Sequence, residues 1–340
     1  MPDLTSSVCE ILIEGILKGT FLPGSKLLSE REFAEKYSVS RITVRRAFSR
    51  LEQAGILIRR RPAGTYIAET FQAHSQEMKS IGLITSLPNE FSGKFVEAVS
   101  SCCEKEDLLL ALGIPEPDTL ESQLKIAVRM ASRGVKNLIV WGAEKKGEMA
   151  IFERLRILGV NLVFFDQVIP GDFADYVGLN NELAIRSLFR TAAELGKTRF
   201  LFLCQNETHI DSASERKQAF QKCLQDSGFD GEIISIPPFA DLEERQQFLR
   251  KLQAKIKPET AVIAMNAPVL ISLFRKPLKH GLLMCVDDTA NLRELNAVGY
   301  AQPIRKMAEE SVALLKNQCL NGKKWIPVHR RFNGTITKIS

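Results

Sequence analysis

The most concentrated chemistry in this sequence is the positive charge near its N-terminus. Between residues 36 and 61 there are eight basic side chains and one acidic side chain, Glu52, so this stretch carries a net charge of +7. The whole chain of 340 residues carries +6, so the remainder is close to neutral. Clustered arginine and lysine attract polyanions such as the phosphate backbone of DNA. The basic residues are Lys36, Arg41, Arg45, Arg46, Arg50, Arg59, Arg60 and Arg61.

A second group of polar residues directly follows short apolar runs in the later part of the chain. If those runs are parallel strands, the polar residues lie at their carboxyl ends, where α/β proteins bind ligands. Any one of them could simply cap the following helix, but their recurrence favours a binding cleft. They are Thr85-Ser86, Trp141-Gly142, Asp166-Gln167, Asn266 and Asp287-Asp288.

The sequence contains no arrangement typical of a catalytic or metal site. Gly196-Lys197-Thr198 is not a phosphate-binding loop, because Thr191 stands where that motif needs glycine and a strand follows rather than precedes it. The four histidines are scattered, and neither G-x-S-x-G nor G-x-G-x-x-G occurs. We interpret Asp287-Asp288 as the end of a loop rather than a metal site. We therefore expect no enzymatic activity, no cofactor and no bound metal.

Two helices are predicted to position the basic residues. Ser29 and Glu32 have the spacing of a capping box, so a helix should begin there. Ser40 is suited to cap a second helix, in which residues 44, 47, 48 and 51 form one apolar stripe. The outward-facing residues of this second helix are then Ile42, Thr43, Arg45, Arg46 and Ser49.

A hairpin is predicted after the second helix. Gly55 is placed to end the helix. Ile56-Leu57-Ile58 starts one strand and Thr65-Tyr66-Ile67 is its partner, with a turn between them that contains Pro62 and Gly64 and lies beside Arg60. Two helices followed by a basic hairpin form a winged helix-turn-helix, which places its second helix in a DNA groove.

The first seventy or so residues resemble the DNA-binding domain of the GntR family of bacterial repressors. The resemblance rests on L-P-G-S-K-L at 22–27, S-E-R-E-F-A at 29–34 and V-S-R-I-T-V-R at 39–45. Two positions depart from the family pattern, since Ile42 replaces a small polar residue and Pro62 replaces a wing glycine. The resemblance implies DNA contacts by Arg31, Arg41, Thr43, Arg45 and Gly64. With the outward-facing or wing residues Ile42, Arg46 and Arg60, these complete the expected DNA-binding set.

From Ile81 onward, short apolar runs alternate with amphipathic stretches such as residues 94–106 and 214–227. Buried strands separated by helices predict an α/β fold with parallel strands. Over this length the strands can form one wide sheet or two lobes. The predicted strands lie at residues 81–84, 108–112, 138–141, 162–165, 200–203, 233–236, 261–264 and 282–286.

The region from Ile81 to about Lys316 resembles the effector domain of LacI/GalR repressors, which is similar to periplasmic sugar-binding proteins. The resemblance rests on L-N-N at 179–181, E-L-G-K-T-R-F at 194–200, S-E-R-K-Q-A-F at 214–220, residues 260–266 and Asp287-Asp288. It departs from the family at Ala219, at Ala267 and in G-K-T-R at 196–199. It implies a two-lobed domain in which Arg216, Asn266 and Asp287 hydrogen-bond sugar hydroxyls.

Three further residues complete the expected effector site. Asp166 is a polar residue at a predicted strand end, and Trp141 or Phe91 could cover the apolar face of a sugar ring.

Taken together, these patterns predict three parts of the chain. They are a winged helix-turn-helix at residues 1–68, a linker at 69–79 and an effector-binding and dimerisation domain at 80–340.

The remaining features indicate a cytoplasmic protein. The N-terminus has no basic segment before its apolar run, which Glu10 and Glu14 interrupt, so we expect no signal peptide. No apolar run approaches the length of a membrane helix. The seven cysteines include no C-x-x-C pair, which favours reduced thiols.

We expect a homodimeric transcription regulator, a repressor, that binds double-stranded operator DNA and a small polar effector such as a sugar. One alternative keeps the same DNA-binding domain but makes the second domain a nucleobase sensor, an amino-acid sensor or an enzyme. Another alternative is a DNA-binding protein that responds to no ligand.

Overall fold

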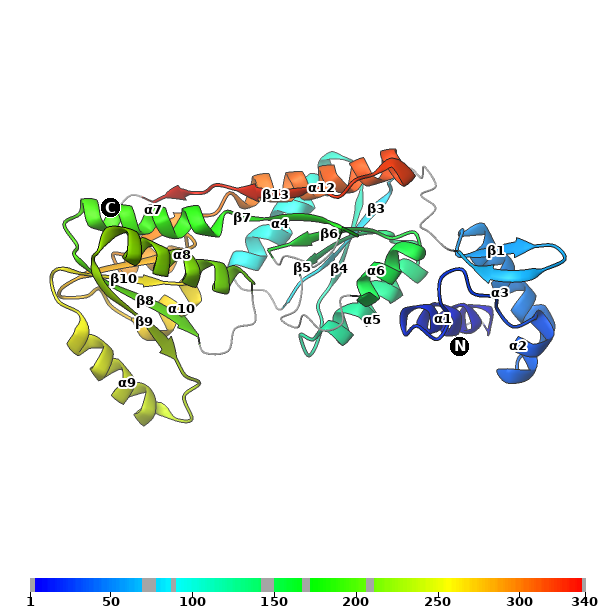
Figure 1. Cartoon of the computed structure of the whole chain (residues 1–340), viewed down its shortest axis with the longest axis horizontal. Helices are drawn as coiled ribbons and strands as arrows, with labels where there is room; N and C mark the ends of the chain where they lie inside the picture. The colour runs from blue at the N-terminus through cyan, green and yellow to red at the C-terminus, as the bar shows by residue number, and fades with distance from the viewer. Residues whose placement is uncertain are drawn as a thin grey trace. The chain divides into compact units, whose positions relative to one another are not determined.

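The computed structural model describes residues 4–68, 78–86, 90–141, 150–166, 172–205 and 211–337 (Figure 1). Residues 4–68 form the head. It consists of three helices and a two-stranded antiparallel hairpin: α1 (Leu4–Leu17), α2 (Glu30–Lys36), α3 (Arg41–Gln53), β1 (Leu57–Arg60) and β2 (Gly64–Ile67).

The local signals in the head act as the sequence predicts. The Ser29 side chain accepts from the backbone N–H of Glu32, whose carboxylate accepts from the N–H of Ser29. Ser40 caps α3 by accepting from the N–H of Thr43. Val44, Ala47, Phe48 and Leu51 are all buried, which confirms the predicted apolar stripe. Gly55 follows α3 with a φ of +72°, a conformation that favours glycine.

The first large sheet has six strands in the order β13-β7-β6-β5-β3-β4. Its pairs β3–β4, β3–β5 and β5–β6 are parallel. In Figure 1, α5 and α6 cover one face of this sheet and α12 the other. The strands are β3 (Ser80–Ile84), β4 (Leu109–Gly113), β5 (Asn137–Trp141), β6 (Asn161–Phe165), β7 (Asp175–Leu179) and β13 (His329–Phe332). The helices are α4 (Glu90–Lys105), α5 (Leu120–Ser132), α6 (Ala150–Ile157) and α12 (Ile304–Asn321), followed by the 3₁₀ turn η2 (Gly322–Lys324).

The second large sheet also has six strands, in the order β14-β12-β11-β10-β8-β9. Neighbouring strands are parallel except that β14 pairs antiparallel with β12. The strands are β8 (Arg199–Gln205), β9 (Asp230–Ile236), β10 (Thr260–Ala264), β11 (Leu282–Val286), β12 (Val298–Ala301) and β14 (Thr335–Ile336). The helices are α7 (Asn181–Glu194), α8 (Asp211–Ser227), α9 (Leu242–Lys255), α10 (Ala267–Leu273) and α11 (Ala290–Glu294).

The contacts of the chain divide it into two compact units. The first unit contains Met1–Pro88, Val96–Tyr176 and Ala308–His329, and therefore holds the head together with β3 to β6. The second contains Asn89–Phe95, Val177–Met307 and Arg330–Ser340. Strands β7 and β13 begin in the first unit and end in the second. Of the two architectures that the sequence left open, the structure has the one with two sheets.

The predicted strands are present, but four others were missed. Strand β7 carries Asp175 within a short run, β12 contains glycine, and β13 is mostly charged, so none of them has the continuous apolar pattern of a buried strand. Strand β14 has only two residues. Residues 196–198, which the sequence excluded as a phosphate-binding loop, connect α7 to β8, so a strand follows them as expected.

Most of the predicted linker, residues 69–77, lies outside the described residues, so the domain boundaries stay a prediction. Within the described ranges, no helix combines the length and apolar character that crossing a membrane requires.

Candidate functional site

The head exposes the side of α3 that the sequence predicted. Arg41, Arg45 and Arg46 are exposed, and Thr43 is half-buried. Ile42 has 65% of its surface exposed, which is unusual for a large aliphatic residue on a folded helix. An exposed apolar group between arginines can contact a thymine methyl while the arginines contact phosphates or base edges.

Two of the expected DNA-binding arginines are ion-paired to glutamates on α2. Arg45 Nε lies 3.0 Å from Glu30 Oε2, and Arg31 Nε lies 3.0 Å from Glu35 Oε1. Arg59, which was not in the expected set, also reaches Glu30 at 3.2 Å. The sequence did not reveal Glu30 as a shared partner because it lies 15 residues before Arg45 and 29 before Arg59.

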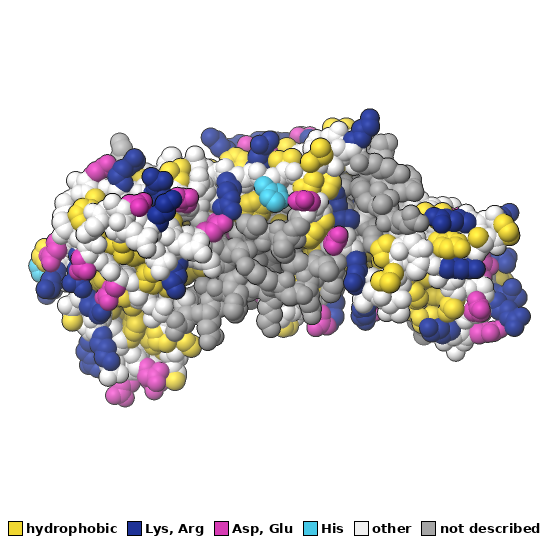
Figure 2. Space-filling view, in the orientation of Figure 1, with side chains coloured by type: hydrophobic (Ala, Val, Ile, Leu, Met, Phe, Trp, Pro, Cys, Tyr) yellow, Lys and Arg dark blue, Asp and Glu magenta, His cyan; other side chains and the backbone are white. Residues whose placement is uncertain are grey.

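The wing is built around Gly64, Tyr66 and Lys26. Gly64 has a φ of +118°, and a Cβ there would lie 2.9 Å from Lys26 Cε. The Arg60 guanidinium lies over the Tyr66 ring, 5.0 Å from its centroid, in a cation–π contact. Figure 2 shows basic side chains spread over the head, with some acidic side chains between them. The wing therefore adds cations to those of α3.

A polar cluster in the second unit joins the three residues predicted to bind the effector. Arg216, on α8, is buried, and its Nε donates to Asn181 Oδ1 at 2.8 Å. Its Nη1 donates to the carbonyl oxygen of Met265 at 2.8 Å. Asp287, at the end of β11, accepts from the backbone N–H of Ala267 at 3.1 Å.

Arg216 and Asp287 thus bind the backbone on either side of Asn266. Asn266 caps α10, since its Oδ1 accepts from the N–H of Val269 at 2.9 Å. Asn266 is therefore a helix cap, which was one of the two interpretations of the sequence, and its role in ligand binding stays a prediction. Its Nδ2 makes no hydrogen bond to another described residue. Arg216, Asn266 and Asp287 are called the strand-end cluster below.

Asp287 is buried and its backbone is strained. Its φ is +101°, and Gln302 Nε2 donates to its second carboxylate oxygen at 2.6 Å. Burial raises the pKa of Asp287, while the positive charge of Arg216 opposes that rise. Within the described part of the chain, Gln302 Oε1 and Thr289 Oγ1 are buried without a hydrogen-bond partner. A buried polar atom without a partner is costly, so such atoms indicate a place for a ligand or water.

Gln302 and Asn181 were not among the predicted site residues. Gln302 directly follows β12, a strand that the sequence did not reveal. Asn181 lies in L-N-N at 179–181, a segment noted for the resemblance but not for a site. Its position next to Asn180, the N-cap of α7, was the available signal.

The other expected effector residues are divided between the two units. Trp141 ends β5 in the first unit, and its ring packs edge-on against Phe165 with centroids 5.1 Å apart. Asp166 directly follows β6 with a φ of +64°, the same left-handed backbone that Asp287 adopts after β11. Phe91 lies in the first turn of α4, a segment that belongs to the second unit. Their role in a shared site stays a prediction.

The family comparison concerns the head. Residues 4–67 match the model described as "Bacterial regulatory proteins, gntR family". The head is a GntR-type winged helix-turn-helix. It is 45% identical over 58 residues to the uncharacterized HTH-type transcriptional regulator YurK of Bacillus subtilis, a match that covers 17% of this chain and 24% of YurK. The chain is 38% identical over 80 residues to the arabinose metabolism transcriptional repressor of Halalkalibacterium halodurans, a match that covers 22% of this chain and 21% of that repressor. The chain thus spans about a quarter of the length of these relatives.

The remainder, beyond the GntR-type head, matches solved structures in its fold. The Cra transcriptional dual regulator of Pseudomonas putida, in complex with fructose 1-phosphate, gives a TM-score of 0.64 at 16% identity, over 78% of this chain and all of the other. A periplasmic binding protein/LacI transcriptional regulator of Alkaliphilus metalliredigens, complexed with D-xylulofuranose, gives a TM-score of 0.64 at 14% identity. This match covers 76% of this chain and 97% of the other. The two-sheet region therefore has the LacI/periplasmic-binding-protein fold, and both predicted resemblances are confirmed.

Proposed function

We propose that this protein is a transcription repressor whose affinity for operator DNA is switched by a small polyhydroxylated ligand, a sugar or a sugar derivative. The head binds double-stranded DNA through α3 and the wing. The strand-end cluster binds the ligand. The observation that carries this proposal is that Arg216 and Asp287 are both held by the backbone around Asn266, in a chain that also has a GntR-type head.

The chemistry of the strand-end cluster suits a polyol. The carboxylate of Asp287 accepts from hydroxyl groups, the guanidinium of Arg216 donates, and the amide of Asn266 can donate through its Nδ2. Arg216 uses Nε and Nη1 in protein contacts, and its Nη2 makes no hydrogen bond to a described residue. These groups are held in place before a ligand arrives, so binding orders few side chains.

The relatives support a sensor rather than an enzyme. Their descriptions name transcription regulators, among them repressors of arabinose metabolism, and two of the structural neighbours were solved with sugars or a sugar phosphate. A ligand can change DNA affinity only through its differential affinity for two states of the protein, typically about 1–3 kcal/mol of coupling.

The test begins with the full chain and a panel of pentoses, hexoses, sugar phosphates, nucleobases and amino acids. A ligand that binds the native state raises the unfolding temperature. Each hit is then added to a gel-shift titration on operator DNA. The proposal requires a sugar-class hit that changes the DNA affinity by at least several-fold. A nucleobase or amino-acid hit would replace the ligand class, and release of a chemically changed product would make the protein an enzyme.

We also propose that the protein acts as a homodimer on a two-fold operator, because one head offers only a small DNA interface. Sedimentation at micromolar concentration should give the mass of two chains. A monomer that still binds operator DNA tightly would contradict this.

A further inference from the structure

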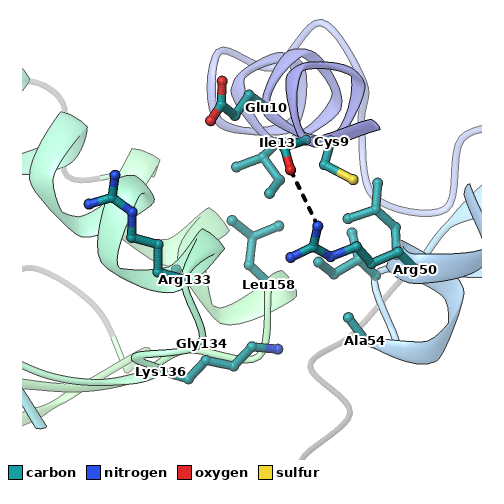
Figure 3. A pocket seen from close by; sticks show the side chains of 13 residues that line it. Cys9, Glu10, Ile13, Arg50, Ala54, Arg133, Gly134, Lys136 and Leu158 are labelled. Atoms are coloured by element: carbon teal, nitrogen blue, oxygen red, sulfur yellow. Dashed lines mark hydrogen bonds between the residues drawn. The ribbon is translucent and has the colours of Figure 1, made fainter. Parts of the chain in front are cut away.

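A cavity of about 620 Å³ lies within the first unit, between the head and the turn from α5 to β5 (Figure 3). Its volume falls in the range of small-molecule sites. The head contributes residues of α1 and α3 together with Ala54 and Ile56, and the other wall consists of Ala131, Arg133, Gly134, Lys136 and Leu158. Arg154 Nη1 donates to the carbonyl oxygen of Leu17 at 2.6 Å, so a hydrogen bond also joins the two sides. We call this the junction cavity.

Most of the wall of the junction cavity is apolar. Cys9, Ile13, Leu51, Ile56 and Leu158 line it, and all five are buried in the fold. A wall of this kind favours the apolar body of an organic molecule over a fully hydrated ion.

The polar lining is mainly basic. Arg50, Arg133 and Lys136 line the junction cavity, and Glu10 is the acidic residue among the lining residues. In Figure 3 the Arg50 guanidinium and the Lys136 ammonium point into the space between the two walls, whereas Arg133 and Glu10 point away from it. Two cations from opposite walls therefore share one space without a carboxylate between them.

Lys136 has no compensating charge in the described part of the chain. Its ammonium takes part in no hydrogen bond or ion pair with a described residue, although the side chain is half-buried. Burial lowers the pKa of Lys136, and no acidic group offsets that effect. Arg50 is held only weakly, since its Nη1 lies 3.4 Å from Ser6 Oγ. A partly desolvated cation without a partner is stabilised by an anion that enters the same space.

We propose that the junction cavity binds an organic acid, with its carboxylate between Arg50 and Lys136 and its apolar body against Ile13 and Leu158. This is a second small-molecule site, separate from the strand-end cluster. Arg50 belongs to α3 of the head and Lys136 to the opposite wall. Such a ligand would therefore contact both walls and stabilise the packing of the head against the turn from α5 to β5.

The test uses 1-naphthoate as the probe and neutral 1-naphthamide as its charge-free match, titrated into the full chain without DNA or sugar. The wild-type protein should bind naphthoate at least tenfold more tightly than naphthamide. Added sodium chloride should weaken the binding of naphthoate but not that of naphthamide. Lys136→Gln and Arg50→Gln should each remove this preference. Arg133→Gln, at the same cavity but directed away, should retain it.

Three outcomes would overturn the proposal: equal affinity for the two probes, unchanged naphthoate binding in Lys136→Gln, or full displacement of naphthoate by equimolar inorganic phosphate. The comparisons with salt and with naphthamide use the wild-type protein, so they test the proposal even if a substitution prevents folding. This proposal and the sugar proposal can fail independently. The Asp287→Ala variant should bind naphthoate with the affinity of the wild-type protein, whether or not the strand-end cluster binds a sugar.

Discussion

Arg45 in the head and Arg216 in the second unit are both bound to other protein groups, but in opposite surroundings. Arg45 is 64% exposed in its pair with Glu30, whereas Arg216 is only 4% exposed and donates to an amide and a carbonyl oxygen. An exposed ion pair contributes about 0–1 kcal/mol, so a DNA phosphate can replace Glu30 at little cost. A buried arginine must keep its hydrogen bonds in every state.

The difference suggests two ways of binding. The head surface exchanges partners and should depend strongly on salt. The strand-end cluster is preorganised and should depend on the geometry of buried hydrogen bonds. The following predictions test this contrast, beginning with the largest effect.

Asp287→Ala should abolish the ligand response and destabilise the fold. The substitution leaves the N–H of Ala267 and the amide of Gln302 without their acceptor, at about 1–3 kcal/mol for each donor. Chemical denaturation and ligand-dependent gel shifts would measure both effects. Asp288→Ala is the matched control. The Asp288 side chain is adjacent in sequence but exposed, so its removal should change stability and the ligand response little. A normal response in Asp287→Ala would place the ligand site elsewhere.

Arg45→Ala should weaken specific DNA binding by about 1–3 kcal/mol, if Arg45 reads a base edge from its outward position on α3. Arg60→Ala, on the wing, should weaken binding to all sequences more evenly. Gel-shift titrations on operator and random duplexes separate the two cases. Equal losses on both duplexes for Arg45→Ala would assign it to phosphate contact only.

The stability cost of Asp287→Ala should shrink as the pH rises. Because burial raises the pKa of Asp287 in the folded state, the folded protein holds this proton more tightly than the unfolded chain. The stabilising contribution of Asp287 is therefore greatest below the ordinary aspartate pKa and falls as the pH passes through the raised value. Urea unfolding of both proteins across this pH range gives the difference. A cost that grows with pH would contradict the raised pKa.

Glu30→Gln should have the smallest effect, a several-fold gain in DNA affinity at low salt. It removes the ion pair of Arg45 and one of the two ion pairs of Arg59, whose Nε still lies 3.6 Å from Glu52 Oε2, and it takes one negative charge away from the proposed DNA-binding surface. Glu14→Gln, which breaks the exposed pair between Glu14 of α1 and Lys18, is the control and should change DNA affinity little. A loss of affinity in Glu30→Gln would mean that Glu30 positions Arg45 for DNA rather than competing for it.

The sequence by itself determined the elements whose signals are local. The capping box at Ser29, the cap at Ser40 and the stripe that begins at Val44 act over a few residues, so they can be read without a partner. The apolar runs of most central strands are equally local. The resemblances then predicted Arg216, Asn266 and Asp287 as residues of one site, though from three separate segments.

Only the tertiary structure decided which atoms meet. Glu30 reaches Arg45, Gln302 reaches Asp287, and Arg216 and Asp287 bind the backbone on either side of Asn266. These contacts join residues 15 to 49 positions apart, and no periodicity in the sequence encodes them. Strand β12 was missed for the same reason, since its place depends on pairing with β11 rather than on its own four residues. Local propensity sets the elements, whereas burial and pairing between distant segments set the site.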